Sequence, residues 1–488
     1  MKKSIIIIGS GIAGLSAGCY GQMNGFKTKI FEMHNLPGGL CTSWKRKGYT
    51  FDGCLHWLVG SGEASPFYKI WQELGATQME VIDYSEFTRI EGPENKTMIV
   101  YTNIDKFESH LKELAPEDES VICELADAVR ELCLFKQPLK KAKELYNLLD
   151  EASLLLKILP HAKIFSKYRN VKVIDFVKQF QNDFLKDAFS RIFTPEFPML
   201  ALLFTLAGLN NKSSGFPKGG SLAFAKTLER HYIELGGTVQ YKSRVDKILI
   251  KNGKAEGIRL IDGTEYMADI VISAADGYAT IFKMLEGNYI NKQIKDYYDH
   301  LPIFEPLIQV SLGIHRDLSD IPHNIRHWLN QPISIAGKEL NSMTVRHYCF
   351  DSSLAPAGKS VVITNFQSDY AYWEKFKEDR EAYEAEKKKI ADTYINEINK
   401  IYPGLKEDIE VIDVATPLTY KRYTDNWQGS FEGWLITTKT LGMSMNKTLP
   451  GLENFFMIGQ WVEPGGGVPT AALSGRDVIQ IICKKENK

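Results

Sequence analysis

A glycine-rich turn after the first apolar run constrains the fold of this chain more than any other feature. Residues 4–8 (SIIII) form a β-branched run that is typical of a strand buried on both faces. Gly9, Gly11 and Gly14 follow with the spacing G-x-G-x-x-G, and small residues continue as a helical segment. A second strand, KTKIFE, ends at Glu32. The pattern predicts the first βαβ unit of an α/β fold.

This unit has the features of a dinucleotide site in a Rossmann-like domain. Gly9 makes the tight turn, Gly11 lets the backbone approach a pyrophosphate, and Gly14 lets helix and strand pack closely. The helix N-terminus offers free N–H groups to a diphosphate. Glu32, 18 residues after Gly14, can accept hydrogen bonds from ribose hydroxyls and would repel the 2′-phosphate of NADP. A tight βα turn without a ligand is the alternative.

Bulk properties exclude several other classes of protein. The 488 residues predict two or more domains, and a net charge of -1 gives no basic surface for nucleic acid. The charged start and short apolar run lead straight into the turn, so they indicate a strand and not a signal peptide. The longest apolar stretch, 197–209, is shorter than the roughly 18 to 20 residues of a spanning helix. Seven cysteines without a Cys-x-x-Cys pair predict reduced thiols, a cytoplasmic protein and no metal site.

Two further glycine clusters favour a cofactor longer than NAD. Gly38 and Gly39 follow Glu32 after six residues. An NAD domain needs no such pair, whereas FAD needs a second narrow passage for its ribityl and flavin parts. A third cluster, PGGGVP at 464–469, lies more than 400 residues further along and would allow close approach to the same cofactor. We therefore expect FAD.

Four stretches give the chain a family resemblance. The pair Gly38–Gly39 is followed by YTFDGCLHWL, and the other stretches are 216–276 (FPKGG to ISAAD), 415–434 (ATPLTYKRYTDNWQGSFEGW) and 458–475 (IGQWVEPGGGVPTAALSG). Together they resemble the phytoene desaturase-type flavoproteins. That family includes carotenoid desaturases, carotenoid isomerases and retinol saturase-like enzymes, and it is related to the amine oxidases.

The resemblance implies further cofactor contacts. The backbone at Val245 would follow the adenine, Gly459 would begin a turn under the diphosphate or ribityl, and 466–468 would pass close to the flavin ring. Leu40 stands where family members often have arginine, and a leucine side chain cannot make that arginine's phosphate contact. The predicted FAD-binding residues are Gly9, Gly11, Ile12, Ala13, Gly14, Glu32, Gly38, Gly39, Leu40, Val245, Gly459, Gly466, Gly467 and Val468.

Two insertions interrupt the dinucleotide domain, which we expect in three segments, 1–95, 212–280 and 411–488. The insertions, 96–211 and 281–410, would form an α+β substrate-binding domain, the first of them mostly helical and the second beginning with a strand.

Residues 136–172 mix lysines with Leu, Ile, Phe and Tyr. Such a segment can lie on an anionic membrane surface, or it can pack on its own domain with its lysines outward.

The expected chemistry is hydride transfer to flavin N5 from a long apolar, isoprenoid-like substrate, with C–C desaturation first among the reactions. Isomerisation or saturation of a polyene, an amine oxidase and a flavin carrier without turnover are the alternatives. His56 and Glu463 are candidate catalytic residues, because His56 titrates near neutral pH and Glu463 adjoins the last glycine cluster. A structural role is the alternative for both. Candidates for an aromatic tunnel are Trp57, Phe193, Phe197, Phe204, Trp427, Phe431 and Trp434.

Overall fold

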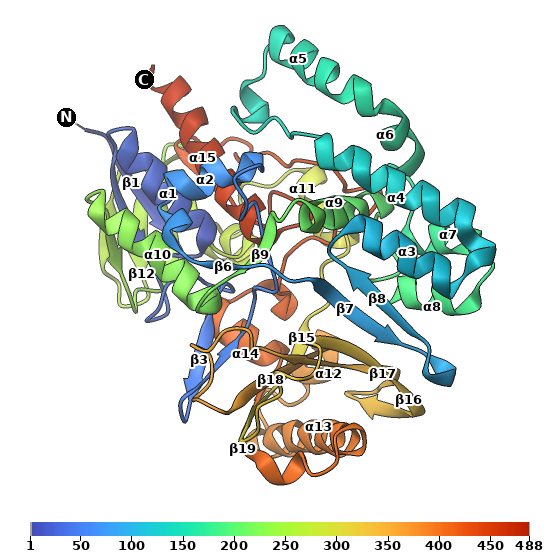
Figure 1. The fold of residues 1–488 in the computed structure, drawn as a ribbon. Helices are drawn as coiled ribbons and strands as arrows, with labels where there is room; N and C mark the ends of the chain where they lie inside the picture. Colours follow the sequence, from blue (N-terminus) through green and yellow to red (C-terminus); the bar gives the residue numbers. More distant parts are fainter. Residues whose placement is uncertain (1, 488) are drawn as a thin grey trace.

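A five-stranded parallel sheet forms the dinucleotide-binding part of the computed structural model, which describes residues 2–487 (Figure 1). Its strands come from distant parts of the chain and lie in the order β10 (Thr238–Gln240), β2 (Lys27–Phe31), β1 (Ser4–Ile8), β14 (Ile270–Ser273) and β20 (Phe455–Met457). Each neighbouring pair is parallel. The central position of β1 explains why its residues are apolar on both faces.

Different layers cover the two faces of this sheet. Ile5 and Ile7 of β1 pack in a core with the helices α1 (Ile12–Met23), α10 (Gly220–Glu234) and α15 (Gly467–Lys485). Ile6 and Ile8 pack on the opposite side. That second core includes an antiparallel sheet of β11 (Val245–Lys251), β12 (Lys254–Leu260) and β13 (Glu265–Met267).

A seven-stranded mixed sheet forms the second part of the molecule. Its strands are β19 (Ile409–Ala415), β15 (Leu307–Ile314), β18 (Ser360–Gln367), β17 (Lys338–His347), β16 (Asn324–Ile335), β7 (Glu86–Glu91) and β8 (Thr97–Tyr101), in that order. The charged helix α13 (Arg380–Ile401) packs on one face, where its Tyr394 and Ile395 share a core with Val310 and Leu312 of β15. The charge run of this helix is therefore its solvated side.

Helices fill most of the first insertion. They are α3 (Ile104–Leu114), α4 (Glu119–Leu134), α5 (Leu148–Ile158), α6 (Ala162–Tyr168), α7 (Val173–Phe176), α8 (Asp183–Ser190) and α9 (Met199–Asn210). The long apolar stretch became α9, which is buried among the other helices. No helix within residues 2–487 has both the length and the apolar character needed to cross a bilayer. In Figure 1, α5 and α6 project from the upper right of the molecule.

Shorter elements connect these parts: β3 (Ser43–Arg46), β4 (Tyr49–Asp52), β5 (Leu58–Val59), α2 (Pro66–Glu73), β6 (Val81–Ile82), β9 (Ser214–Pro217), α11 (Lys292–His300), α12 (Tyr370–Glu374) and α14 (Pro417–Thr424). The expected fold class is confirmed as a Rossmann-like α/β part with an α+β part and a helical insertion. The three-segment division of the chain stays a prediction. The strands β7 and β19, at the edges of two predicted dinucleotide segments, pair within the seven-stranded sheet.

Gly475 provides a test of how α15 packs on α1. A Cβ atom at this position would lie 2.4 Å from the carbonyl oxygen of Ala13 and 2.7 Å from the nitrogen of Ala17. Both are backbone atoms and cannot rotate away. We expect G475V to lower the free energy of unfolding by about 1–3 kcal/mol, measured by thermal or urea unfolding. The control is K484V on the exposed side of the same helix, which should cost only a few tenths of a kcal/mol. Equal stability of the two variants would show that the helices do not meet this closely.

Candidate active site

A large cavity of about 1710 Å³ is lined by residues of both sheets and of the helical insertion. Pockets for a single small ligand are roughly 300–1,000 Å³, so this cavity has room for a dinucleotide and a second molecule. All the predicted FAD-binding residues except Gly14 line it, as do both candidate catalytic residues, His56 and Glu463. Gly14 has the packing role expected from its place in the motif, since a Cβ there would lie 2.0 Å from the carbonyl oxygen of Gly9.

The first two glycine clusters meet at the N-terminus of α1. Gly9 has a φ of +97°, which an L side chain rarely adopts. Gly11 and Gly38 form an isolated parallel bridge, and the Gly38 nitrogen donates to the carbonyl oxygen of Ser10 at 2.9 Å. No side chain caps α1 at Gly11. Free N–H groups at a helix N-terminus beside a cavity suit a diphosphate, so this site fits the expected cofactor.

Glu32 is held at the edge of the same cavity. Its side chain accepts hydrogen bonds from the nitrogen (2.7 Å) and hydroxyl (2.8 Å) of Ser10 and from the nitrogen of His34 (2.8 Å). Its carbonyl oxygen accepts from the nitrogen of Ser243, two residues before Val245. The structure thus brings Val245 close to Glu32, the residue that the sequence analysis predicts to bind the ribose.

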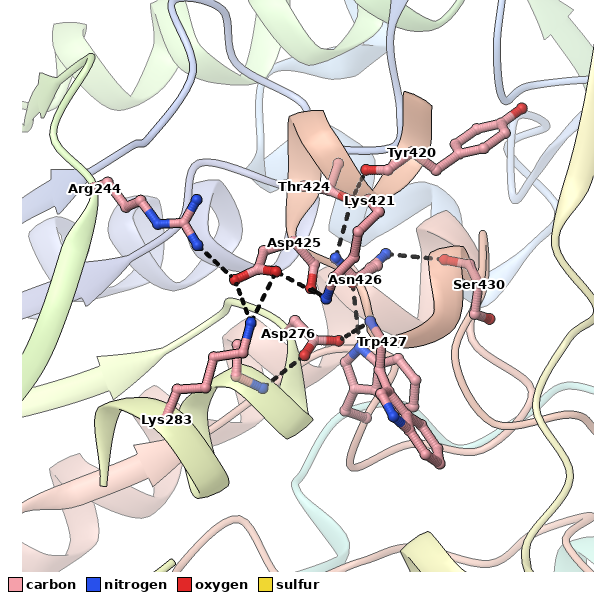
Figure 2. Close-up of polar contacts among 12 residues, drawn as sticks. Arg244, Asp276, Lys283, Tyr420, Lys421, Thr424, Asp425, Asn426, Trp427 and Ser430 are labelled. Carbon is pink, nitrogen blue, oxygen red and sulfur yellow. Dashed lines mark hydrogen bonds and ion pairs between the residues drawn. The ribbon is translucent and has the colours of Figure 1, made fainter. Parts of the chain in front are cut away.

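A polar network joins the 415–434 segment to the dinucleotide part (Figure 2). Asp425, after α14, pairs with Arg244 at 2.8 Å, Lys283 at 3.1 Å and Lys421 at 2.8 Å. Three cations thus converge on one carboxylate, and they come from three separate elements. This arrangement fixes the segment that carries Glu432.

Asp276 provides a second connection in Figure 2. It follows β14 and accepts hydrogen bonds from the nitrogens of Trp427 and Ala279, both at 2.7 Å. Burial raises the pKa of Asp276 to about 6. The sequence analysis did not single out Asp276 or Asp425, although carboxylates after a strand or helix end are a common positioning device.

The last glycine cluster has a reason for glycine in addition to the expected approach of the flavin ring. Gly466 and Gly467 have φ values of +50° and +83° and begin α15. A Cβ at Gly466 would lie 2.3 Å from the carbonyl oxygen of Glu432, and one at Gly467 would lie 3.1 Å from its Oε1. The sequence attributed these glycines to the flavin ring alone. In the structure, Glu432 packs against them, and their backbone conformation also requires glycine.

Glu432 is the functional candidate that the sequence analysis missed. Its carboxyl lines the cavity and forms no hydrogen bond or ion pair with another residue in the described range 2–487. Burial raises its pKa to about 8, so the side chain is protonated at neutral pH. The FEGW motif lies within a stretch that carries the family resemblance, but no pattern in it separates a buried carboxyl from an exposed one.

His56 does not titrate as expected. The Nη1 atom of Arg346 lies 2.8 Å from Nδ1 of the imidazole. Burial, and then the charge of Arg346, lower the pKa of His56 well below its usual value. The ring is therefore neutral at physiological pH, and the expectation of titration near neutrality is wrong. His56 still faces the cavity, so a role in catalysis stays a prediction.

Glu463 is held in an ion pair. Its Oε1 lies 2.7 Å from Nζ of Lys447, which also lies 2.5 Å from a carboxylate oxygen of Glu144. Burial alone would lower the pKa of Lys447, but the two carboxylates outweigh it and raise the pKa. A carboxylate committed to a buried cation is a poor proton carrier, so the structure favours Glu432 over Glu463.

Most of the expected aromatic tunnel lines the cavity. The lining members are Trp57, Phe193, Phe197, Phe204 and Phe431. Trp427 and Trp434 are exceptions, because they pack with Trp461 in a core, with ring centroids 6.0 Å apart for Trp427 and Trp434. Trp434 is fully buried there. Sequence alone could not separate aromatic residues that line the cavity from those that pack in the core, since both roles use the same residue types.

Comparisons with known proteins agree with this geometry. Residues 12–482 match the family model for flavin containing amine oxidoreductases. The chain is 28% identical to a prolycopene isomerase of Daucus carota, covering 96% of this chain and 78% of that protein. It is 25% identical to an all-trans-retinol 13,14-reductase of Danio rerio, covering 97% and 85%. An oxidoreductase structure from Methanosarcina mazei is 18% identical, with a TM-score of 0.62 over 98% of this chain and 100% of that one.

The family match spans nearly the whole chain. It includes the second and third glycine clusters and Gly14 of the first, whereas Gly9 and Gly11 precede it. Together with the fold and the cavity, it establishes the expected cofactor. This chain belongs to the flavin-containing amine oxidoreductase family and uses FAD.

Proposed function

We propose that the chain is an FAD-dependent oxidoreductase that transforms carbon–carbon double bonds of a long apolar polyene. The observation that carries this proposal is the cavity itself, which extends from the dinucleotide turns to a wall of aromatic rings. Such a wall suits an extended conjugated chain. Two similar proteins are named for reactions of prolycopene and of all-trans-retinol, which supports a substrate of this kind.

Glu432 supplies the proton chemistry in this proposal. A bound flavin supplies hydride transfer. The protonated carboxyl of Glu432, beside the Gly466–Gly467 turn, holds a proton that it can donate to a substrate carbon. Proton donation favours isomerisation or saturation. Desaturation, the first expectation from sequence, needs a proton acceptor, which this carboxyl becomes only above pH 8 or so.

Anaerobic turnover tests the proposal directly. Protein reconstituted with FAD is mixed with a poly-cis carotene or a retinoid, with and without NADPH, and the products are separated and weighed by mass spectrometry. A change of isomer without a change of mass indicates isomerisation, gain of two hydrogens indicates saturation, and loss of two indicates desaturation. Failure to bind FAD, or failure to change any polyene in either redox state, would overturn the proposal.

The pH dependence of turnover tests Glu432. Its pKa is raised to about 8, so the acid form is complete below that pH and is lost above it. We expect kcat to fall about tenfold per pH unit above pH 8 or so if the acid form is required.

The variant E432Q should lower kcat by about 10²–10⁴-fold and remove this alkaline limb, because glutamine cannot donate the proton. E463Q is the matched control, since its carboxylate is already paired with Lys447. Retention of the alkaline limb in E432Q would assign it to another group.

We also propose that Glu32 holds the adenosine ribose of FAD. The variant E32A should weaken FAD binding by about tenfold to a hundredfold, because a charged hydrogen-bond acceptor is lost. FMN lacks the adenosine part, so its binding should change little. A flavin fluorescence titration with both cofactors checks this, and an equal loss for FMN would show that E32A damages the fold instead.

We propose further that α5 contacts an anionic membrane surface. The segment 136–172 contains nine lysines and arginines against three acidic residues. Exposed leucines gather on and beside α5, with Leu148 83% exposed. They are Leu148, Leu149, Leu155, Leu156 and Leu159. The other side of the same helix carries Leu154 and Ile158, which line the cavity. A lipid substrate could pass from the bilayer to the cavity along this helix.

Vesicle binding tests the membrane contact. The triple variant L149S/L155S/L156S should reduce co-sedimentation with phosphatidylglycerol vesicles at least about tenfold, since each buried leucine contributes up to roughly 1.5–3 kcal/mol. The control I261S/M267S replaces two comparably exposed residues, 68% and 62%, near the antiparallel sheet. An equal loss in both variants, or no binding by the original protein, would contradict the contact.

A further inference from the structure

One part of the cavity lining is polar, in contrast to the aromatic residues that line other parts of it. It is the face of the seven-stranded sheet turned away from α13, formed by alternate residues of β16, β17 and β18. Its polar members are Asn324, Arg326, Ser342, Thr344, Arg346, Asn365 and Gln367. A pure hydrocarbon against this wall would leave these groups without partners, at a cost in free energy.

Two arginines of this wall form no ion pair with a carboxylate of the described range 2–487, although Asp187 lies near enough to Arg326 to raise its pKa in part. In the antiparallel register, Arg326 lies opposite Thr344, and Arg346 lies two residues further along, so the arginines are diagonal neighbours within roughly 8 Å. Arg326 forms no hydrogen bond or ion pair through its side chain with any residue of the described range. Arg346 contacts the neutral ring of His56.

The third arginine nearby, Arg191, has the two kinds of partner that Arg326 lacks. Arg191 pairs with Asp187 at 2.7 Å and lies over the ring of Trp328, 4.7 Å from its centroid. Arg326 has neither kind of partner. Burial, and then the charges of Arg191 and Arg346, lower the pKa of Arg326 to about 10, and it remains protonated at neutral pH. A charge removed from water without a paired group raises the free energy of the folded protein, unless a ligand of opposite charge binds to it.

An orphaned amide oxygen lies on the same wall. Asn324 is 8% exposed and lines the cavity. Its Nδ2 donates to the carbonyl oxygen of Phe87 at 3.1 Å, which fixes the amide, while its Oδ1 has no partner. Oδ1 of Asn365 also lacks one. These acceptors suit a hydroxyl group or a water beside a polar substrate end.

We propose that Arg326 and Arg346 bind a terminal carboxylate of the substrate, whose apolar chain lies along the aromatic wall. This inference rests on the proposed function and narrows its substrate to long-chain polyene acids. The guanidinium group presents a planar pair of donors that matches a carboxylate. The cofactor does not account for these charges, because its diphosphate has a separate cradle at the N-terminus of α1. Two cations without ion pairs in the described range also oppose an amine substrate.

A fluorescent polyene acid tests the proposal without requiring turnover. FAD-loaded protein is titrated with cis-parinaric acid and with its methyl ester, which has the same chain and no charge. We expect the acid to bind about tenfold to a hundredfold more tightly than the ester. In R326M, the acid should lose most of this advantage, while the affinity for the ester stays unchanged. R326K, which keeps the charge, should retain part of the preference.

The control variant is R380M, which removes an exposed arginine at the start of α13. It should bind both ligands like the original protein, and the flavin absorbance of each variant confirms its fold. Equal binding of acid and ester by the original protein would overturn the proposal, as would an equal loss of both ligands in R326M with the flavin intact. Turnover of a neutral polyene without any preference for the acid would leave the proposed function standing and reject the carboxylate site. A protein that binds no FAD would instead reject the proposed function.

Discussion

The hydrogen bonding of β1 between β2 and β14 is the interaction on which the site depends. It places the turn after β1 beside the ends of strands that come from elsewhere in the chain. β20 continues the same sheet, and the nitrogen of Ile458 donates to the carbonyl oxygen of Ser273 at 2.9 Å. Gly459 therefore lies next to α1, where its Cβ would be 3.5 Å from that of Ala13. Segments more than 400 residues apart line one cavity because they are neighbours in one sheet.

The electrostatics of the cavity differ from one region to another. At the C-terminal glycine turn, Glu432 is uncharged at neutral pH because burial raises its pKa. On the sheet wall, Arg326 and Arg346 remain cationic, and the imidazole between the sheet and the dinucleotide part, His56, is neutral. The aromatic wall contributes no charge. A molecule bound in this cavity therefore meets a protonated carboxyl, two cations and apolar rings within one lining.

The sequence predicted those parts of the site that depend on local backbone geometry. The turn at Gly9 and the carboxylate at Glu32, which both line the cavity, could be found because a dinucleotide motif has these residues at a fixed spacing. Glu432 and Arg326 could not be found in this way. Their importance comes from facing the cavity without a partner in the described range, which depends on segments far away in the sequence. The same cause explains His56, whose pKa is lowered by burial and by an arginine 290 residues away.

The buried Lys447 has a mechanical consequence. It joins Glu144, just before the projecting α5, to Glu463, just before the turn that begins α15. A displacement of the chain at Glu144 must either carry Glu463 with it or separate charges inside a protein environment, where separation is costly. The ammonium group of Lys447 thus couples the chain before α5 to the turn before α15. An outward movement of the segment at Glu144 would pull on the segment at Glu463.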